Sequence, residues 1–465
     1  MVNKKEPSSF RDNSGFLFYR DNVLYRRINR SYYENWERLT KSGLYDLLVA
    51  EGLLLSHEIV DVPDYWDESA ILTIRPRLIP FISYPYEWSF SQLKDAALTT
   101  LKILDVAVKF GMTLRDASAF NIQFFNGKPI LIDTLSLGTY KPGEVLGAYG
   151  QFCRHFLSPL ALCVYRGLEV STALQKQFLD GVDLPLTSGL LPIKTRCSIG
   201  LGVHIHLHSM SIQANASKKS FKKNHGSFFS EKAYRGLLSS LELCINKIKL
   251  LKSKSEWSGY YNELSYTPQA FAAKKNKVGE FLANSFRASD TVLDIGANDG
   301  EFSRMAAGIG FKVLSIDNDY RVCEMNYQKV KVNGESRILP LFVDLINPSP
   351  AIGWDNIERA SFLERSRSKN PIVLALAVIH HLVIGNNTTF DQLARLFSSI
   401  GSTLIIEFVP KQDKQARRLL VVREDIFTKY SKENFENIFS IYFTIRSMFS
   451  IPDTGRILYL MERRK

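Results

Sequence analysis

The run TVLDIGANDGEFS, residues 291–303, combines residue types that could hold a ligand. An apolar stretch ends in Asp294, and Gly296 and Gly300 follow before a helical pattern begins. Glycine lets the backbone approach a ligand closely, and a helix N-terminus presents unpaired N–H groups. The spacing therefore predicts a strand, a ligand-binding turn and a helix, with the ligand at the carboxyl end of the strand.

The glycine spacing separates two kinds of site that share this design, those for dinucleotides and those for S-adenosylmethionine. The dinucleotide fingerprint is G-x-G-x-x-G. Counted from Gly296, Asn298 stands where the second glycine belongs and Glu301 where the third belongs, and Gly300 is out of phase. The sequence therefore gives little support to a nicotinamide cofactor.

The same turn resembles motif I of class I S-adenosylmethionine-dependent methyltransferases, and the resemblance continues in VLSID and LFVDL, which supply Asp317 and Asp344. It implies that Asp317 holds the ribose hydroxyls and that Asp344 reads the adenine amine. The residues that it implies for cofactor binding are Asp294, Gly296, Ala297, Asn298, Gly300, Asp317 and Asp344. The alternative is that the three acids are ordinary turn residues at strand ends.

From residue 291 onward, strand-like runs alternate with helical ones, which predicts a parallel sheet with helices on its faces. The runs IFSIYFTIRSMFSI and RILYLMERR, separated by PDTG, predict an antiparallel hairpin at the end. The resemblance implies an α/β, Rossmann-like methyltransferase domain over 280–465, with a seven-stranded sheet closed by this hairpin.

His380 and His381 follow the run PIVLALAVI, where the resemblance puts the edge of the substrate pocket. A histidine near its ordinary pKa of about 6.5 suits a general base, should the methyl acceptor have to lose a proton. The alternative is that one ring caps the strand end and the other packs. Trp257, Tyr260 and Tyr261 precede the domain and could close over the cofactor, although packing against the sheet is the simpler role.

A second group, in LRDASAFNIQFFNGKPILIDTLS (114–136), places Asp116, Asn121 and Asp133 around a predicted hairpin. It resembles the catalytic loop and metal-binding Asp of protein kinases and aminoglycoside-type phosphotransferases. The resemblance implies that Asp116 is catalytic, and that Asn121 and Asp133 hold Mg²⁺ on the phosphates of ATP. The alternative is that all three are turn residues.

The chain departs from the kinase pattern in several places. Leu114 replaces the usual histidine, Asp-Thr-Leu replaces Asp-Phe-Gly, and no glycine-rich loop lies near the start. Arg26 and Arg27 stand where an early strand would carry a lysine. A kinase-like fold and an active phosphotransferase are therefore separate hypotheses, because function must be argued from a complete site.

In GVHIHLHSM, His204, His206 and His208 are two residues apart. On a strand they would share one face and could bind a transition metal. No fourth ligand is evident, so a half-exposed strand or a glycan-contacting face is the alternative.

Changes in composition along the chain predict its organisation. The expected parts are an α+β domain over 1–210, a basic linker over 211–228, a helical connector over 229–279 and the methyltransferase domain over 280–465. The first part contains a predicted hairpin over 15–28 and an amphipathic helix that ends at Gly111.

The totals limit the partners and the compartment. The 465 residues carry a formal net charge of +12, which favours anionic partners such as nucleic acid, phosphorylated glycans or a membrane surface. Five scattered cysteines and a polar start without a secretory signal predict a cytoplasmic protein. No apolar run is long enough for a transmembrane helix.

The leading hypothesis is a methyltransferase that uses S-adenosylmethionine to methylate an oxygen or nitrogen of an unidentified acceptor, such as a glycan or small metabolite. The two-part arrangement resembles a group of bacterial methyltransferases with a long N-terminal extension, some linked to nodulation or surface-polysaccharide genes. The alternatives are a bifunctional kinase–methyltransferase, an RNA methyltransferase and a non-catalytic scaffold. The sequence leaves the acceptor and the oligomeric state open.

Overall fold

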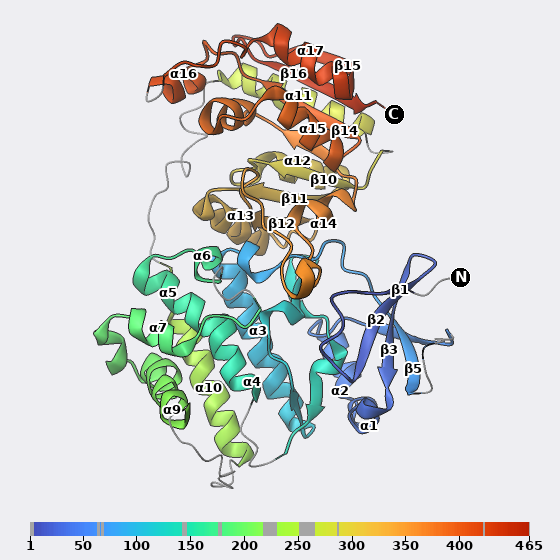
Figure 1. The fold of residues 1–465 in the computed structure, drawn as a ribbon, viewed down its shortest axis with the longest axis vertical. Coiled ribbons are helices and arrows are strands. Elements are labelled where there is room, and N and C mark those ends of the chain that lie inside the picture. Colours follow the sequence, from blue (N-terminus) through green and yellow to red (C-terminus); the bar gives the residue numbers. More distant parts are fainter. Residues whose placement is uncertain are drawn as a thin grey trace. The chain divides into compact units, whose positions relative to one another are not determined.

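The computed structural model describes residues 4–62, 66, 69–141, 147–174, 179–216, 230–250, 266–285, 288–421 and 424–464. The chain forms two compact units, whose elements are labelled in Figure 1. Unit 1 comprises Met1–Lys252 and Ile352–Arg359, and unit 2 comprises Ser253–Ala351 and Ala360–Lys465. Trp257, Tyr260 and Tyr261, for which the sequence left open closure over the cofactor or packing against the sheet, lie outside the described residues.

Unit 1 begins with an antiparallel five-stranded sheet in the order β1-β2-β3-β5-β4. The predicted hairpin is confirmed as β2 and β3, joined by Asp21 and Asn22 with φ of 50° and 63°. Two successive left-handed residues make the two-residue turn that matches the twist of paired strands. The strands are β1 (Lys4–Lys5), β2 (Gly15–Arg20), β3 (Val23–Asn29), β4 (His57–Val60) and β5 (Ala70–Pro76), with α1 (Tyr33–Lys41) and α2 (Leu44–Ala50) between β3 and β4.

The predicted amphipathic helix of unit 1 is α3 (Phe90–Lys109), which starts at a capping box formed by Ser89 and Gln92. Four short strands follow and pair as two antiparallel ladders, β6 with β9 and β7 with β8. They are β6 (Met112–Leu114), β7 (Ile122–Phe125), β8 (Lys128–Leu131) and β9 (Leu137–Thr139). The predicted hairpin around Asn126 is thus β7 and β8.

The rest of unit 1 is helical. Its helices are α4 (Gly147–Phe152), α5 (Ser158–Arg166), α6 (Val170–Leu174), α7 (Leu184–Leu190), α8 (Ile199–Leu201), α9 (His208–Ala216) and α10 (Glu231–Lys247). Helix α9 includes the first residues of the predicted linker, 211–216, and 217–229 lie outside the described residues. The short segment Ile352–Arg359 also belongs to unit 1, where Glu358 accepts from Nε and Nη2 of Arg11 at 2.6 and 2.8 Å.

Unit 2 contains a seven-stranded sheet in the order β12-β11-β10-β13-β14-β16-β15. The first five positions are parallel, and β16 and β15 close the sheet as an antiparallel hairpin. The strands are β10 (Thr291–Ile295), β11 (Lys312–Asp317), β12 (Ile338–Phe342), β13 (Ile372–Ala375), β14 (Thr403–Phe408), β15 (Phe443–Ser450) and β16 (Ile457–Arg463). The predicted Rossmann-like methyltransferase fold is therefore confirmed.

Helices cover both faces of this sheet, so its central strands are buried. Every residue of β10 and β14 is buried, as expected of strands between two helical layers. One core joins α11, α12 and α13 to the sheet. The helices of unit 2 are α11 (Pro268–Ser285), α12 (Glu301–Ile309), α13 (Tyr320–Asn333), α14 (Phe362–Arg367), α15 (Phe390–Ile400), α16 (Lys414–Val421) and α17 (Lys432–Tyr442). The first residues of the predicted final hairpin belong to helix α17, and the observed hairpin starts at Phe443.

Candidate functional site

A cavity of about 240 Å³ lies in unit 2 at the carboxyl ends of β10, β11, β12 and β13. Parallel strands bring their carboxyl ends to one edge of the sheet, so residues distant in sequence converge there. Gly300 is not among the lining residues and lies instead at the N-cap of α12. The predicted cofactor residues that line the cavity are Asp294, Gly296, Ala297, Asn298, Asp317 and Asp344.

The backbone of the turn after β10 favours glycine and asparagine at two positions, Gly296 and Asn298. Gly296 has φ of +68°, and a Cβ at this position would lie 2.3 Å from Cγ1 of Val378. Asn298 is also left-handed, with φ of 50°, a conformation that asparagine tolerates better than most residues. Asn298 therefore has a left-handed backbone conformation, which a glycine would also adopt readily.

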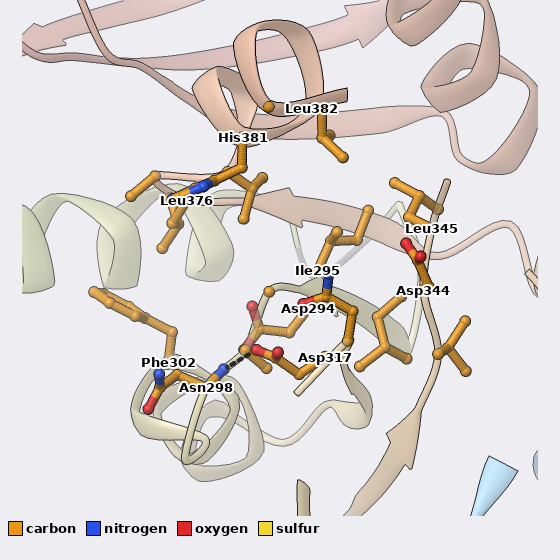
Figure 2. Close-up of a pocket in the computed structure, with 18 of the residues that line it drawn as sticks. Asp294, Ile295, Asn298, Phe302, Asp317, Asp344, Leu345, Leu376, His381 and Leu382 are labelled. Atoms are coloured by element: carbon orange, nitrogen blue, oxygen red, sulfur yellow. Dashed lines mark hydrogen bonds between the residues drawn. The ribbon is translucent and has the colours of Figure 1, made fainter. Parts of the chain in front are cut away.

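Asp317 holds this turn through its carboxylate. Its Oδ2 accepts from the backbone N–H of Asn298 at 2.9 Å (Figure 2), and its Oδ1 accepts from the N–H of Asp319 at the same distance. Each carboxylate oxygen has a further lone pair, so the group can still accept hydrogen bonds from a ligand. At the end of β12, Oδ1 of Asp344 accepts from the N–H of Ile346 at 2.9 Å.

Burial raises the pKa of two carboxyls beneath the turn. The pKa of Asp294 rises to about 7, although Ser303 Oγ donates to its Oδ2 at 2.6 Å. The pKa of Asp317 rises to about 6, against the effect of the backbone donors. A ligand that brings a cation or hydroxyl donors to these groups would favour their ionised forms.

The two candidate bases differ in position. His381 lines the cavity, opposite Asp294 and Asp317 in Figure 2, whereas His380 is fully buried and does not line it. Burial lowers the pKa of His381 to about 4 and that of His380 well below its ordinary value. The expectation of a histidine near pKa 6.5 is therefore wrong, because neither ring is solvated enough to hold a proton at that pH.

A buried group of charged side chains, which the sequence analysis missed, lies against the same cavity. Tyr266 and Lys274 line the cavity, and Nζ of Lys274 lies 2.7 Å from Oε2 of Glu407. Lys274 also donates to the Tyr266 hydroxyl at 3.1 Å, and that hydroxyl donates to Oε1 of Glu407. The lining of the cavity thus includes Lys274, which is paired with Glu407, as well as the carboxyls at the strand ends.

Arg456 extends this group deeper into the unit. Its Nε and Nη2 donate to Asp413 at 2.8 and 3.0 Å, and its Nη1 lies 3.3 Å from Oε1 of Glu407. Burial opposes ionisation of Glu407, but the charges of Lys274 and Arg456 outweigh it and lower the pKa. The available sequence signal was Glu407 itself, a charged residue inside the apolar strand TLIIEF.

No model of a known protein family matches the chain. Nodulation protein NoeA of Rhizobium meliloti (strain 1021) is 32% identical to it over 466 aligned residues, which cover 98% of this chain and 95% of that protein. The chain belongs to the NoeA family.

Solved structures similar to this NoeA-family chain include N-methyltransferase NodS from Bradyrhizobium japonicum WM9 and the bifunctional kinase-methyltransferase WbdD. NodS is 15% identical with a TM-score of 0.32, and the match covers 43% of this chain and 100% of NodS. WbdD is 15% identical with a TM-score of 0.31, and the match covers 44% of this chain and 42% of WbdD. The methyltransferase fold of the NoeA-family chain rests on the strand order of unit 2.

The predicted phosphotransferase residues of the NoeA-family chain lie near one another in unit 1, but Asp133 already has a cationic partner. Its Oδ1 lies 2.7 Å from Nη1 of Arg26 on β3 and accepts from the N–H of Leu135. Asp116 accepts from the N–H of Ser118 through Oδ1, as a turn residue does, and its carbonyl lies 3.5 Å from Nδ2 of Asn121.

The predicted histidine strand is wrong, because the segment is a π-helix (Gly202–Leu207) that continues into α9. His204 lies between Tyr149 Oη and Ser240 Oγ, each at 2.9 Å, and His206 lies 2.8 Å from Thr195 Oγ1. The ring of His208 stacks on Tyr149. Within the described ranges, no three His, Cys, Asp or Glu side chains are grouped as metal ligands.

In the described parts of the chain, every helix falls short of the length or the hydropathy that a bilayer crossing requires.

Proposed function

We propose that the chain is a methyltransferase that transfers the methyl group of S-adenosylmethionine to an oxygen or nitrogen. The observation that carries this proposal is the cavity at the carboxyl ends of β10 to β13, with Asp294, Asp317 and Asp344 around it in a class I methyltransferase sheet. An open α/β sheet binds its ligand at this place.

The residues around the cavity fit the cofactor in charge and in shape. Asp317 would accept from the ribose hydroxyls with its remaining lone pairs, and Asp344 would accept from the adenine amine. Gly296 would let the backbone approach, since a Cβ there would collide with Val378. Asp294 would hold the cofactor's ammonium group, whose positive charge would lower the pKa of about 7 and favour the carboxylate.

The cofactor supplies an electrophilic methyl group, so the protein has to bind, orient and exclude water. An acceptor hydroxyl or amine must also lose a proton. His381 is the neutral base that lines the cavity, since its pKa of about 4 leaves the ring unprotonated near neutral pH. A base with so low a pKa accepts the proton late in the reaction, as the acceptor becomes acidic on methylation.

The acceptor that we propose is a glycan or a small metabolite connected with nodulation. The support is the full-length relationship to a nodulation protein. An anionic glycan would also suit the net charge of +12. An RNA acceptor has less support, because the sequence contains no RNA-binding motif of the kinds that carry aromatic residues for base stacking.

Calorimetric titration of the full chain with S-adenosylmethionine tests the cofactor. Asp317→Ala should raise the Kd at least tenfold, about 1.4 kcal/mol, because the ribose acceptor is lost. Asp290→Ala is the matched control, since Asp290 precedes β10, pairs with Lys312 and does not line the cavity. Equal affinity of the Asp317 variant and the control would remove the assignment, and no binding by the native chain would favour a scaffold.

Radiolabelled S-adenosylmethionine tests the reaction and the acceptor. The full chain is incubated separately with oligosaccharide, metabolite and RNA fractions, and label is followed into each. We expect label in the oligosaccharide or metabolite fraction, and His381→Ala should lower its rate about a hundredfold while the cofactor Kd stays within twofold. Label in RNA would overturn the proposed acceptor without affecting the cofactor assignment.

A further inference from the structure

A row of exposed apolar side chains follows the outer side of the helical segment that runs from α8 to α9 in unit 1. Ile199, Val203, Leu207 and Met210 are 84%, 42%, 56% and 62% exposed. They stand at positions i, i+4, i+8 and i+11, the spacing of one helical face. A surface helix normally turns its polar residues outward, so this segment has the opposite pattern.

The inner side of the segment is fixed, so the apolar row cannot turn inward. Ile205 is fully buried, and His204 and His206 are held by the hydroxyl groups described above. Rotating the helix would break these contacts and leave buried polar groups without partners, which is costly. The outward apolar row is therefore a built feature of the surface.

Neighbouring elements enlarge this face. Helix α7 packs against α9 and against the π-helix that precedes it, and the 3₁₀ helix Ile193–Cys197 packs against that π-helix. Leu190 is 41% exposed and Ile193 is 79% exposed. Figure 1 shows α7 and α9 at the opposite end of unit 1 from its five-stranded sheet. We call Leu190, Ile193, Ile199, Val203, Leu207 and Met210 the outer apolar face.

The charged residues within the segment that forms the outer apolar face are basic. Lys194 and Arg196 are exposed beside Ile193. Within the described residues 184–216, which include the outer apolar face, the charged residues are Lys194 and Arg196. Exposed aliphatic side chains with Lys194 and Arg196 beside them match a surface that is apolar inside and anionic outside, which is the interface of an anionic bilayer.

We propose that the outer apolar face binds in the plane of an anionic lipid surface. Its aliphatic side chains would enter the boundary between headgroups and acyl chains, and Lys194 and Arg196 would lie among the anionic headgroups. A second copy of the chain fits less well. An isologous dimer places each patch against itself, so Lys194 and Arg196 would face their own copies across the interface.

Sedimentation with lipid vesicles tests the proposal on the full chain. We expect it to bind vesicles of phosphatidylcholine with about 30% phosphatidylglycerol at least tenfold more tightly than vesicles of phosphatidylcholine alone, and to be released by salt. The double variant Ile199→Ser/Leu207→Ser should lose at least tenfold in affinity for the anionic vesicles. These side chains are exposed, so the fold should be retained.

A matched control is Val332→Ser/Ile441→Ser, which removes two exposed aliphatic side chains from α13 and α17 of unit 2. It should bind vesicles as the native chain does. Equal binding by the Ile199/Leu207 variant and this control would overturn the proposal, as would absence of vesicle binding by the native chain. If the native chain ignores vesicles and the Ile199/Leu207 variant alone becomes monomeric in light scattering, the face is a dimer interface instead.

Discussion

Asp317 in unit 2 and Asp133 in unit 1 lie at comparable places in the chain, each at the carboxyl end of a strand. Both were predicted to serve a ligand that carries adenosine, and burial raises the pKa of both. Their neighbours differ. Asp317 borders a cavity and accepts from backbone amides, whereas Asp133 faces the guanidinium of Arg26.

The difference shows that a carboxylate at a strand end becomes a binding site through what surrounds it. A buried carboxylate that accepts from amides alone gains stability from a ligand's hydroxyl groups or cation. A carboxylate that already pairs with arginine must give up that partner before it can hold Mg²⁺. The first arrangement favours a ligand, and the second favours a structural role.

The largest expected effect concerns the paired carboxylate. Asp133→Ala should lower the free energy of unfolding of unit 1 by about 2–3 kcal/mol, because Arg26 would be left nearly buried and unpaired. Urea unfolding measures this, and the Kd for S-adenosylmethionine should stay within twofold. Glu58→Ala, which breaks the exposed pair with Arg75, is the control and should leave the free energy of unfolding close to that of the native chain. If both variants lose the same free energy of unfolding, the Arg26–Asp133 pair contributes no more to stability than an exposed ion pair.

The turn beside Asp317 should not tolerate a Cβ atom at position 296. Gly296→Ala places a Cβ against Val378 at a left-handed position, and we expect the Kd for S-adenosylmethionine to rise about thirtyfold, or about 2 kcal/mol. Gly308→Ala is the control, because no atom lies within 4 Å of its Cβ and its φ is not positive. Native affinity in the Gly296 variant would show that the turn does not meet the cofactor.

The raised pKa values should make cofactor binding depend on pH. Asp317, with a pKa of about 6, must be ionised to accept from ribose hydroxyls, so protonation competes with binding. We expect the Kd to rise about tenfold between about pH 7.5 and about pH 5, with protons released on binding. The stability of the free protein depends on pH in the opposite direction. The raised pKa of Asp317 contributes stability at low pH, and this contribution is lost as the pH rises through about 6.

Calorimetry in two buffers of different ionisation enthalpy measures the proton release. Asp317→Ala should flatten the lower part of the pH profile. If the Kd of the native chain does not change over the same pH range, cofactor binding does not depend on the ionisation of Asp317.

The smallest expected effect is in unit 1. Titration of the full chain with Mg-ATP should give no heat above that of dilution, because Asp133 is committed to Arg26. Micromolar binding that is lost in Asp133→Ala would reverse the comparison between the two carboxylates and support the bifunctional hypothesis.

Local patterns could be predicted from the sequence, and distant contacts could not. Motif I and the strand-end acids predicted the sheet of unit 2 and six of the residues that line its cavity, since each signal lies within a few residues. The pairs Lys274–Glu407 and Arg26–Asp133 join residues far apart in the chain, and nothing local indicates them. Alternation in GVHIHLHSM suggested a strand, but tertiary contacts of His204 and His206 fix a helix.

The segment Ile352–Arg359 has a consequence for how this protein can be divided. The chain passes between units after residues 252, 351 and 359, and Glu358 belongs with Arg11 in unit 1. A cut after residue 252 would leave unit 1 without Glu358, and a fragment that begins there would carry a piece of the other unit. Domain shuffling needs a boundary that few contacts cross, so this connectivity ties the two units into one heritable block. The similarity to NoeA extends over both units, as expected if the two units are inherited together.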